Sequence, residues 1–221
     1  MNAKECYDRL KKDYNQSISL ISVQEIYTEI RMFFLKYYNI LYQSEILREK
    51  DGKFSIDESL FVTDDENRQI WVIGAIDNIT KDFWIDVSFK RNEEVLKHFL
   101  TRYIETGNTI ITDSWMGHSF KSSIPGYIRE MHINEAGDFG LGSSSTSHIE
   151  SLWSQLKALL KNLYYIIPHK NFILYLREAE WRIKNKDKNI NAKIKEFFDY
   201  YYTISDMEAS YFVCDYYLNE I

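Results

Sequence analysis

The first fifty residues carry the hydrophobic spacing of amphipathic helices and show no strand alternation. Between residues 23 and 47, apolar side chains recur at intervals of three and four residues, which predicts one long helix or two short ones. The residues that set this spacing are Ile26, Ile30, Phe33, Phe34 and Tyr37. The turn signal at Asp51 and Gly52 then breaks the pattern. We therefore expect residues 1–50 to form a helical region of their own.

Strand character follows this break, in three stretches separated by short polar turns. Residues 54–62, 69–77 and 83–89 are rich in aromatic and β-branched side chains. Because short turns join successive antiparallel strands, these stretches predict an antiparallel meander.

The next segment alternates helix and strand. Asn92 can cap a helix over residues 93–105, and Gly107 ends it. Residues 109–112 form a short apolar run that leads into Asp113, which predicts a buried strand. A strand, a helix and a strand in succession indicate a parallel addition to the meander.

The rest of the chain is predicted to be mainly helical. We expect a short helix over residues 122–129, a short edge strand over 131–134 and a Gly/Ser loop over 135–147. Three further helices are expected over residues 149–162, 170–186 and 194–219.

This order of elements is that of the ribonuclease-H-like fold. The predicted fold class is α/β: a mixed sheet of three antiparallel strands plus parallel additions, flanked by helices, with helical N- and C-terminal extensions. We expect three segments, which are a helical N-terminal region (1–50), a ribonuclease-H-like domain (51–186) and an acidic, aromatic helical tail (187–221).

Composition narrows the class of protein. With 221 residues, of which 45% are hydrophobic and 16% aromatic, the chain can bury one substantial core, which excludes disorder. No apolar run reaches the roughly 18 residues that span a bilayer, and charges occupy the place of a signal peptide's apolar stretch. We therefore expect no membrane partner and an intracellular protein. Cys6 and Cys214 lie at opposite ends of the chain and offer no paired metal-ligand spacing.

Charge is distributed unevenly along the chain. The net charge of −6 argues against binding to nucleic acid by overall charge alone. Residues 151–186, however, hold seven Lys or Arg against two acids, whereas residues 187–221 hold seven acids against three lysines. The basic segment can present a polyanion-binding face within an acidic protein.

Three acids stand out by their positions in the predicted elements. Asp57 lies in mid-strand, where an acid is unfavourable by propensity. Asp113 closes the predicted fourth strand, and Glu150 begins the strongest helix of the second half. In a ribonuclease-H-like sheet the first and fourth strands are neighbours, so the three carboxylates are expected to converge. Such a set of hard oxygen ligands suits two Mg²⁺ or Mn²⁺ ions.

The sequence around these acids resembles a known family. The blocks Ile-Asp-Glu-Ser, Gly-Asn-Thr-Ile-Ile-Thr-Asp-Ser-Trp and His-Ile-Glu-Ser-Leu-Trp-Ser-Gln-Leu-Lys look like the signature of the ISXO2-like DDE transposases, of the IS1595 and Merlin type. The resemblance covers about residues 53–186. It implies that Asp57, Asp113 and Glu150 form the catalytic, metal-binding triad, and that Lys157 is the family's basic residue, placed to contact DNA phosphate.

Further DNA contacts are expected near the triad and in the basic segment. His148 stands beside Glu150 and is expected to meet phosphate rather than metal, because hard divalent ions prefer oxygen. The remaining candidates for DNA binding are Lys161, Arg177 and Arg182. Trp153 is expected to be a core or cleft-wall residue. The aromatic run over residues 197–217 either packs on the protein's own core or forms a partner surface, for example in a dimer.

The resemblance implies a metal-dependent polynucleotidyl transferase, with two Mg²⁺ or Mn²⁺ ions and double-stranded DNA as partner. Water cleaves a strand at an element's end, and the freed 3′-hydroxyl attacks target DNA. Coordination of two ends implies a homodimer or higher oligomer. The alternatives are a domesticated DNA- or protein-binding descendant without transposition activity, and a nuclease without strand transfer. The expected location is the nucleus in a eukaryote, or the cytoplasm and nucleoid in a bacterium.

Overall fold

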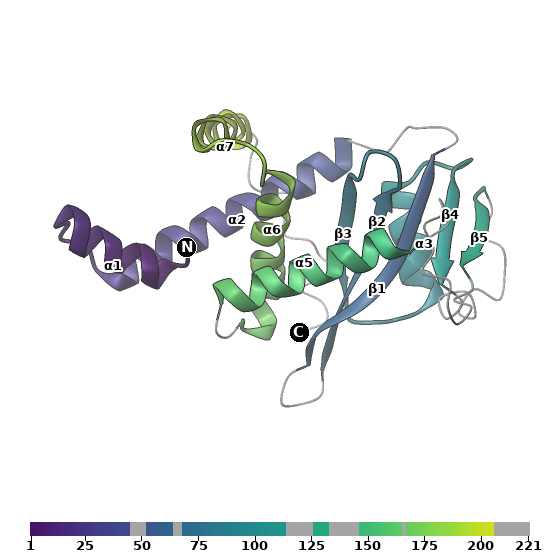
Figure 1. Cartoon of the computed structure of the whole chain (residues 1–221), viewed down its shortest axis with the longest axis horizontal. Coiled ribbons are helices and arrows are strands. Elements are labelled where there is room, and N and C mark those ends of the chain that lie inside the picture. The colour runs from purple at the N-terminus through teal and green to yellow at the C-terminus, as the bar shows by residue number, and fades with distance from the viewer. Residues whose placement is uncertain (45–51, 64–67, 114–125, 133–145, 165–166, 206–221) are drawn as a thin grey trace. The chain divides into compact units, whose positions relative to one another are not determined.

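The computed structural model describes residues 1–44, 52–63, 68–113, 126–132, 146–164 and 167–205 (Figure 1). Contacts divide the chain into two compact units, each described by itself below. One unit is helical and contains residues 1–41, 160–167 and 171–221; the other contains residues 42–159 and 168–170. The units place residues 171–186 with the terminal helices rather than with the sheet, so they divide the chain differently from the three expected segments.

The second unit is built on a five-stranded sheet with the order β3-β2-β1-β4-β5. β1 pairs antiparallel with β2, and β2 antiparallel with β3, while β4 lies parallel to β1 and β5 parallel to β4. This topology confirms the predicted ribonuclease-H-like sheet. The strands are β1 (Lys53–Thr63), β2 (Gln69–Asp77), β3 (Phe83–Ser88), β4 (Thr109–Asp113) and β5 (Ile128–His132).

The two faces of the sheet are covered by different helices. α3 (Glu93–Tyr103) packs on one face of the sheet, and the first part of α5 (Ser147–Leu163) packs on the other. From residue 160 onward, α5 belongs to the helical unit. Figure 1 shows the start of α5 in front of β1 and β2, with α3 behind the sheet. Because both faces are covered, strand residues that alternate in direction are buried alike, as with Ser55 and Ile56 of β1.

Local sequence chemistry explains the borders of the elements. The side chain of Asn92 accepts a hydrogen bond from the backbone N–H of Val95 and caps α3, as predicted. In the turn between β2 and β3, the carboxylate of Asp77 accepts hydrogen bonds from the N–H groups of Ile79 and Thr80. Asp77 therefore stabilises the backbone of the turn.

Two predicted elements need correction or completion. The helix expected over residues 122–129 is wrong at its end, because residues 128 and 129 open β5, whose backbone pairs with β4 from Thr109 onward. Residues 122–125 of that prediction, 133–145 around the expected strand and loop, and 206–219 of the expected last helix lie outside the described part of the chain.

The helical unit has α1 (Ala3–Tyr14), α2 (Leu20–Ser44), α6 (Phe172–Lys184) and α7 (Ile190–Ser205). A 3₁₀ turn, His169–Asn171, precedes α6. Aromatic rings join α2 to α7: the ring centroids of Phe33 and Phe197 are 4.5 Å apart, and those of Tyr37 and Tyr200 are also 4.5 Å apart. Part of the aromatic run thus packs on the protein's own helices.

Buried charge fixes the contact between α2 and α6. Arg31 donates from Nε to Glu178 at 2.8 Å, and Arg182 donates from Nη2 to the same carboxylate at 2.7 Å. Burial alone would raise the pKa of Glu178, but the Tyr164 hydroxyl and the two guanidinium groups outweigh it and hold the pKa below its usual value. The carboxylate is therefore a charged anchor inside this unit.

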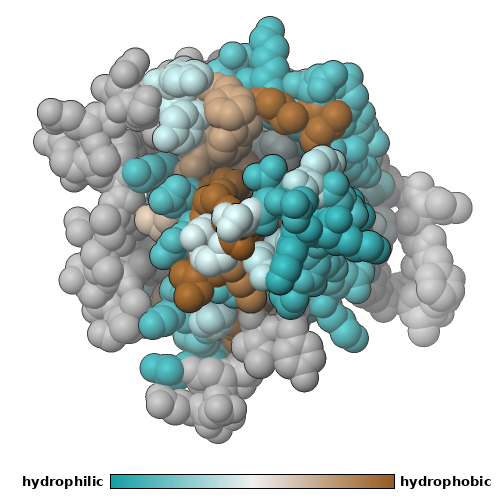
Figure 2. All heavy atoms as spheres, turned by 90° about the vertical axis from the view of Figure 1, so that its left-hand side faces the viewer, coloured by the Kyte–Doolittle hydropathy of each residue, from teal (hydrophilic) through white to brown (hydrophobic). Residues whose placement is uncertain are grey.

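Apolar residues also reach the surface. Figure 2 shows hydrophobic residues among a largely hydrophilic face of the molecule. In the helical unit the exposed ones include Ile21, Ile194, Phe198 and Tyr202. Within the described residues, no helix has the length and hydropathy needed to cross a membrane.

Candidate active site on the sheet

Asp57 is the best-defined member of the predicted triad. It lies in mid-strand on β1, half-buried, and its Oδ2 accepts a hydrogen bond of 2.8 Å from the indole Nε1 of Trp153 on α5. Gly74 of β2 stands directly across from Asp57 in the antiparallel register. A Cβ at Gly74 would lie 2.6 Å from Cη2 of Trp153. The glycine therefore leaves the space that the indole ring occupies.

Asp113 reaches the same region through the parallel pairing of β1 and β4. The register pairs Lys53 with Thr109 and Ser55 with Ile111. Two residues further along both strands, this register would align the backbone position of Asp113 with that of Asp57. The pairing itself ends at Ser55 and Ile111, and the side chain of Asp113 lies outside the described part of the structure. The approach of the two carboxylates therefore stays a prediction.

Glu150 lies in the first turn of α5, one helical turn before Trp153, and is exposed. The hydroxyl of Thr146 donates a hydrogen bond of 3.0 Å to its Oε1. Thr146 is itself only 4% exposed, and its backbone oxygen accepts from the N–H groups of Ile149 and Glu150. Thr146, which directly precedes α5, therefore accepts the first backbone hydrogen bonds of the helix and also orients the carboxylate of Glu150.

The residues fit a divalent-cation site by their chemistry. Asp57, the Asp113 position and Glu150 offer carboxylate oxygens, which Mg²⁺ and Mn²⁺ prefer. A carboxylate has about four lone-pair directions, so the donors Trp153 and Thr146 can each hold one oxygen while ligation uses the rest. Among the side chains that the structure describes, which do not include that of Asp113, no three acidic, His or Cys groups cluster around one point.

A pair of basic groups flanks the start of α5. The Nζ of Lys81, in the turn between β2 and β3, lies 2.7 Å from Nε2 of His148. Partial burial, together with the Lys81 ammonium, lowers the pKa of His148. Because an ammonium can only donate, the Lys81 Nζ is the donor and the His148 Nε2 is the acceptor of this hydrogen bond. His148 thus stays a candidate phosphate contact, now with a cationic partner.

Lys157 lies on the same side of the sheet as Asp57. Its Nζ donates to the hydroxyl of Ser59 at 2.7 Å and stands 5.1 Å from the centre of the Phe61 ring. The side chain is exposed and an ammonium has three donors, so it can also meet a phosphate. Lys161, one turn later on α5, is exposed as well.

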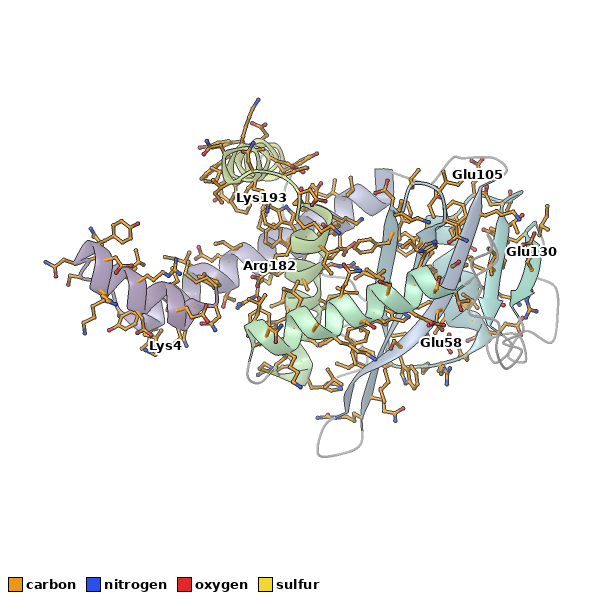
Figure 3. The ribbon with its side chains drawn as sticks, viewed as in Figure 1. Lys4, Glu58, Glu105, Glu130, Arg182 and Lys193 are labelled. Atoms are coloured by element: carbon orange, nitrogen blue, oxygen red, sulfur yellow. The ribbon has the colours of Figure 1, made fainter. Side chains whose placement is uncertain are left out.

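Two basic residues of α6 are placed differently from expectation. Arg177 is 2% exposed and donates to the buried carboxylate of Glu180 at 2.8 Å. A side chain buried in this way does not reach a DNA phosphate, which argues against the predicted contact of Arg177 with DNA. Arg182, labelled in Figure 3, is part-buried and pairs with Glu178 through two nitrogens, a structural contact.

The opposite face of the sheet carries a different arrangement. Glu58, labelled in Figure 3, alternates away from Asp57 and pairs with Arg91, whose guanidinium lies 4.5 Å from the centre of the Trp71 ring. These residues line a cavity on the α3 side. Glu58 is therefore engaged on the face of β1 opposite to that of Asp57.

Sequence reasoning missed three residues of the site: Thr146, Gly74 and Lys81. Thr146 carried a usable signal, because a hydroxyl residue just before a helix is a common cap. Gly74 also carried one, since a glycine inside a strand often marks a close approach. Nothing in the local sequence marks Lys81, because its partner, His148, lies 67 positions away in the sequence.

Comparison with solved structures finds retroviral integration proteins. A simian T-cell lymphotropic virus intasome in complex with a PP2A regulatory subunit matches 66% of this chain and 52% of its own, at 16% identity and a TM-score of 0.40. The HTLV-2 integrase catalytic core domain, solved with magnesium in a dimeric form, matches 61% of this chain and 86% of its own, at 13% identity and a TM-score of 0.39. The chain thus spans about half of the first of these chains.

Comparison with sequences gives the family. No curated protein matches the chain. The model of the ISXO2-like transposase domain matches residues 43–184, a range that contains the whole sheet, the start of α5 and all three candidate acids. Since that range covers more than half of the 221 residues, the resemblance seen in the motifs is confirmed, and the protein belongs to the ISXO2-like transposase family.

Proposed function

We propose that this protein is a DNA polynucleotidyl transferase that cleaves a strand at an element's end and joins the freed 3′-hydroxyl to target DNA. Asp57, Asp113 and Glu150 form its catalytic triad. The observation that carries the proposal is the parallel pairing of β1 with β4, which ends at Ser55 and Ile111. Continued two residues further, the same register would set the backbone of Asp57 beside that of Asp113. Family membership supports the same reaction class.

The triad would hold two divalent cations, Mg²⁺ or Mn²⁺. When bound, such ions supply Lewis acidity to the attacking and leaving oxygens of an in-line phosphodiester displacement. The chain's own contribution is to fix the ligands on rigid elements. β1 and β4 would hold the first two carboxylates, and the hydroxyl of Thr146 holds the third, that of Glu150, at the start of α5.

Basic side chains of α5 and of the turn between β2 and β3 would hold the DNA backbone. Lys157 and Lys161 lie one turn apart on α5 and are both exposed. His148, with Lys81 beside it, stands two residues from Glu150. Phosphate contacts of this kind position a duplex without reading its sequence. The partner implied is double-stranded DNA, and pairing of two DNA ends implies a homodimer or higher oligomer.

A joining assay tests the proposal. The protein is incubated with Mn²⁺, a library of duplex oligonucleotides with random ends and a supercoiled plasmid, and joined molecules are amplified and sequenced. The proposal predicts oligonucleotide–plasmid junctions that disappear in Asp57→Asn, Asp113→Asn and Glu150→Gln. Glu130→Gln is the matched control, because Glu130 is an acid of the same sheet that pairs with Lys53.

The two other candidate functions give other products. A nuclease without strand transfer shortens the DNA and yields no junctions, with the same dependence on the triad. A domesticated DNA-binding descendant shifts the duplexes in a gel and yields neither product. Either pattern, obtained with folded protein, contradicts the proposal.

A further inference from the structure

We propose that Trp153 is a positioning residue for the first metal ligand: its indole N–H fixes the orientation of the Asp57 carboxylate, in a slot that Gly74 keeps open. This inference rests on the proposed function, because it gives Asp57 the role of a metal ligand. Its own content is the coupling between an indole on α5 and a carboxylate on β1.

The contact joins two rigid elements. Trp153 Nε1 donates to Asp57 Oδ2 at 2.8 Å, a distance typical of a hydrogen bond to a charged oxygen. An indole N–H is a donor only, so the bond has one possible direction, from Trp153 to the Asp57 oxygen. The bond leaves Asp57 with further lone pairs for ligation.

The ring itself is held on two sides. On the sheet, Gly74 is the residue opposite Asp57, and a Cβ there would lie 2.6 Å from Cη2 and 3.2 Å from Cζ2 of the indole. Phe61, further along β1, meets the ring in a T-shaped contact at 5.9 Å between centroids. Trp153 is 5% exposed. A tryptophan confined in this way has little freedom to turn its N–H away from Asp57.

The orientation of a metal-binding side chain affects how well it binds the metal. Hydrogen-bond donors that contact the metal-binding side chains set the geometry and the basicity of those side chains. Removal of such an outer donor typically lowers metal affinity about 10- to 100-fold. Trp153 would therefore act through Asp57, without contact to metal or DNA. The neighbouring bond from Thr146 to Glu150 gives the second described ligand a donor of its own.

The first experiment compares two tryptophans with equal burial. Trp153→Phe removes the N–H and keeps an aromatic ring, while Trp84→Phe makes the same change in β3. Trp84 is also 5% exposed and pairs with Ala75, next to Gly74 but on the other face of the sheet. The Mn²⁺ dissociation constant is measured by electron paramagnetic resonance on the full chain. We expect Trp153→Phe to raise it about 10- to 100-fold, and Trp84→Phe to change it less than about threefold.

Equal affinity in wild type and Trp153→Phe overturns the inference, provided that Asp57→Asn lowers Mn²⁺ binding. If Asp57→Asn leaves binding unchanged, the proposed function fails at its first ligand, and the role given to Trp153 fails with it. The Asp57→Asn variant thus separates failure of the positioning role from failure of the metal site.

A second measurement uses proteins that keep Trp153, so it stays informative even if the Trp153→Phe variant does not fold. The ¹⁵N–¹H signals of the tryptophan indoles are recorded for wild type and Asp57→Asn, with and without Mg²⁺. We expect the Trp153 signal to move in Asp57→Asn and to shift on addition of Mg²⁺ in wild type alone, while the Trp84 signal stays in place. A Trp153 signal whose chemical shift stays the same in Asp57→Asn and on addition of Mg²⁺ overturns the inference.

Discussion

Adding a single methyl group at Gly74 gives a sharp test of the packing at the candidate site. The new Cβ of Gly74→Ala would stand 2.6 Å from Cη2 of Trp153 and 3.2 Å from Cγ2 of Ile85. Contacts of 2.6 Å do not persist, so the indole ring or the start of α5 must move. Overpacking of this kind costs about 1–3 kcal/mol.

Part of that cost is offset. Gly74 has no positive φ, so alanine can adopt its strand conformation and reduces the entropy of the unfolded chain by about 0.4–1 kcal/mol. We expect Gly74→Ala to lower the free energy of unfolding by about 1–2 kcal/mol, the difference of these two effects. Urea titration followed by far-ultraviolet circular dichroism measures it.

A double-mutant cycle attributes the cost to the ring. Phenylalanine lacks the indole atoms that meet the new Cβ, so only the 3.2 Å contact with Ile85 remains in the Trp153→Phe background. Gly74→Ala should therefore cost less there than in wild type by about 1 kcal/mol or more. The expected coupling of about 1 kcal/mol or more exceeds the roughly 0.3–0.5 kcal/mol seen for independent sites. In the Trp84→Phe background the two changes should add. Equal costs of Gly74→Ala in the wild-type and Trp153→Phe backgrounds would refute the reasoning.

Three further predictions concern single contacts. Thr146→Val removes the hydroxyl that holds Glu150 and should weaken Mn²⁺ binding about tenfold, whereas Thr146→Ser should keep it; equal binding by both variants would count against the contact. Lys157→Ala should weaken binding of any duplex and reduce the salt slope of binding by about 1, whereas Lys97→Ala, on α3 and paired with Glu93, should change neither. Glu178→Gln should cost about 3–5 kcal/mol at pH 7 because two arginines lose their counter-charge. The pKa of Glu178 is lowered in the folded protein. This stabilisation is therefore present above the usual pKa of a glutamate and is lost as the pH falls through the lowered value, so the difference from wild type should shrink in urea titrations at progressively more acidic pH.

The strands and most helices could be predicted because their hydrophobic patterns are long and local. The expected second strand, residues 69–77, has the same bounds as β2, and the Asn92 cap of α3 is present. The start of β5 could not be predicted, because a short segment such as Gly126–Arg129 has no decisive period and takes its strand form from pairing with β4. Long-range backbone pairing decided that element.

The candidate acids could be selected from the sequence, whereas their supporting contacts could not. Asp57 was conspicuous in the sequence as an acid inside a predicted strand. Which basic residues are free to meet DNA depends on tertiary packing. Arg177 donates a hydrogen bond to Glu180 inside the helical unit. No local sequence pattern distinguishes this buried arginine from an exposed one on an amphipathic helix.

The central claim, that Asp57, Asp113 and Glu150 form one metal site, is tested most directly by calorimetric titration of the full chain with Mn²⁺. Wild type is compared with Asp57→Asn, Asp113→Asn and Glu150→Gln, and with Glu130→Gln as the acid of the same sheet that should not matter. The account predicts that each triad variant loses at least about tenfold in affinity while Glu130→Gln binds as wild type does. Binding that is absent in folded wild type, or unchanged in all three triad variants, would contradict it.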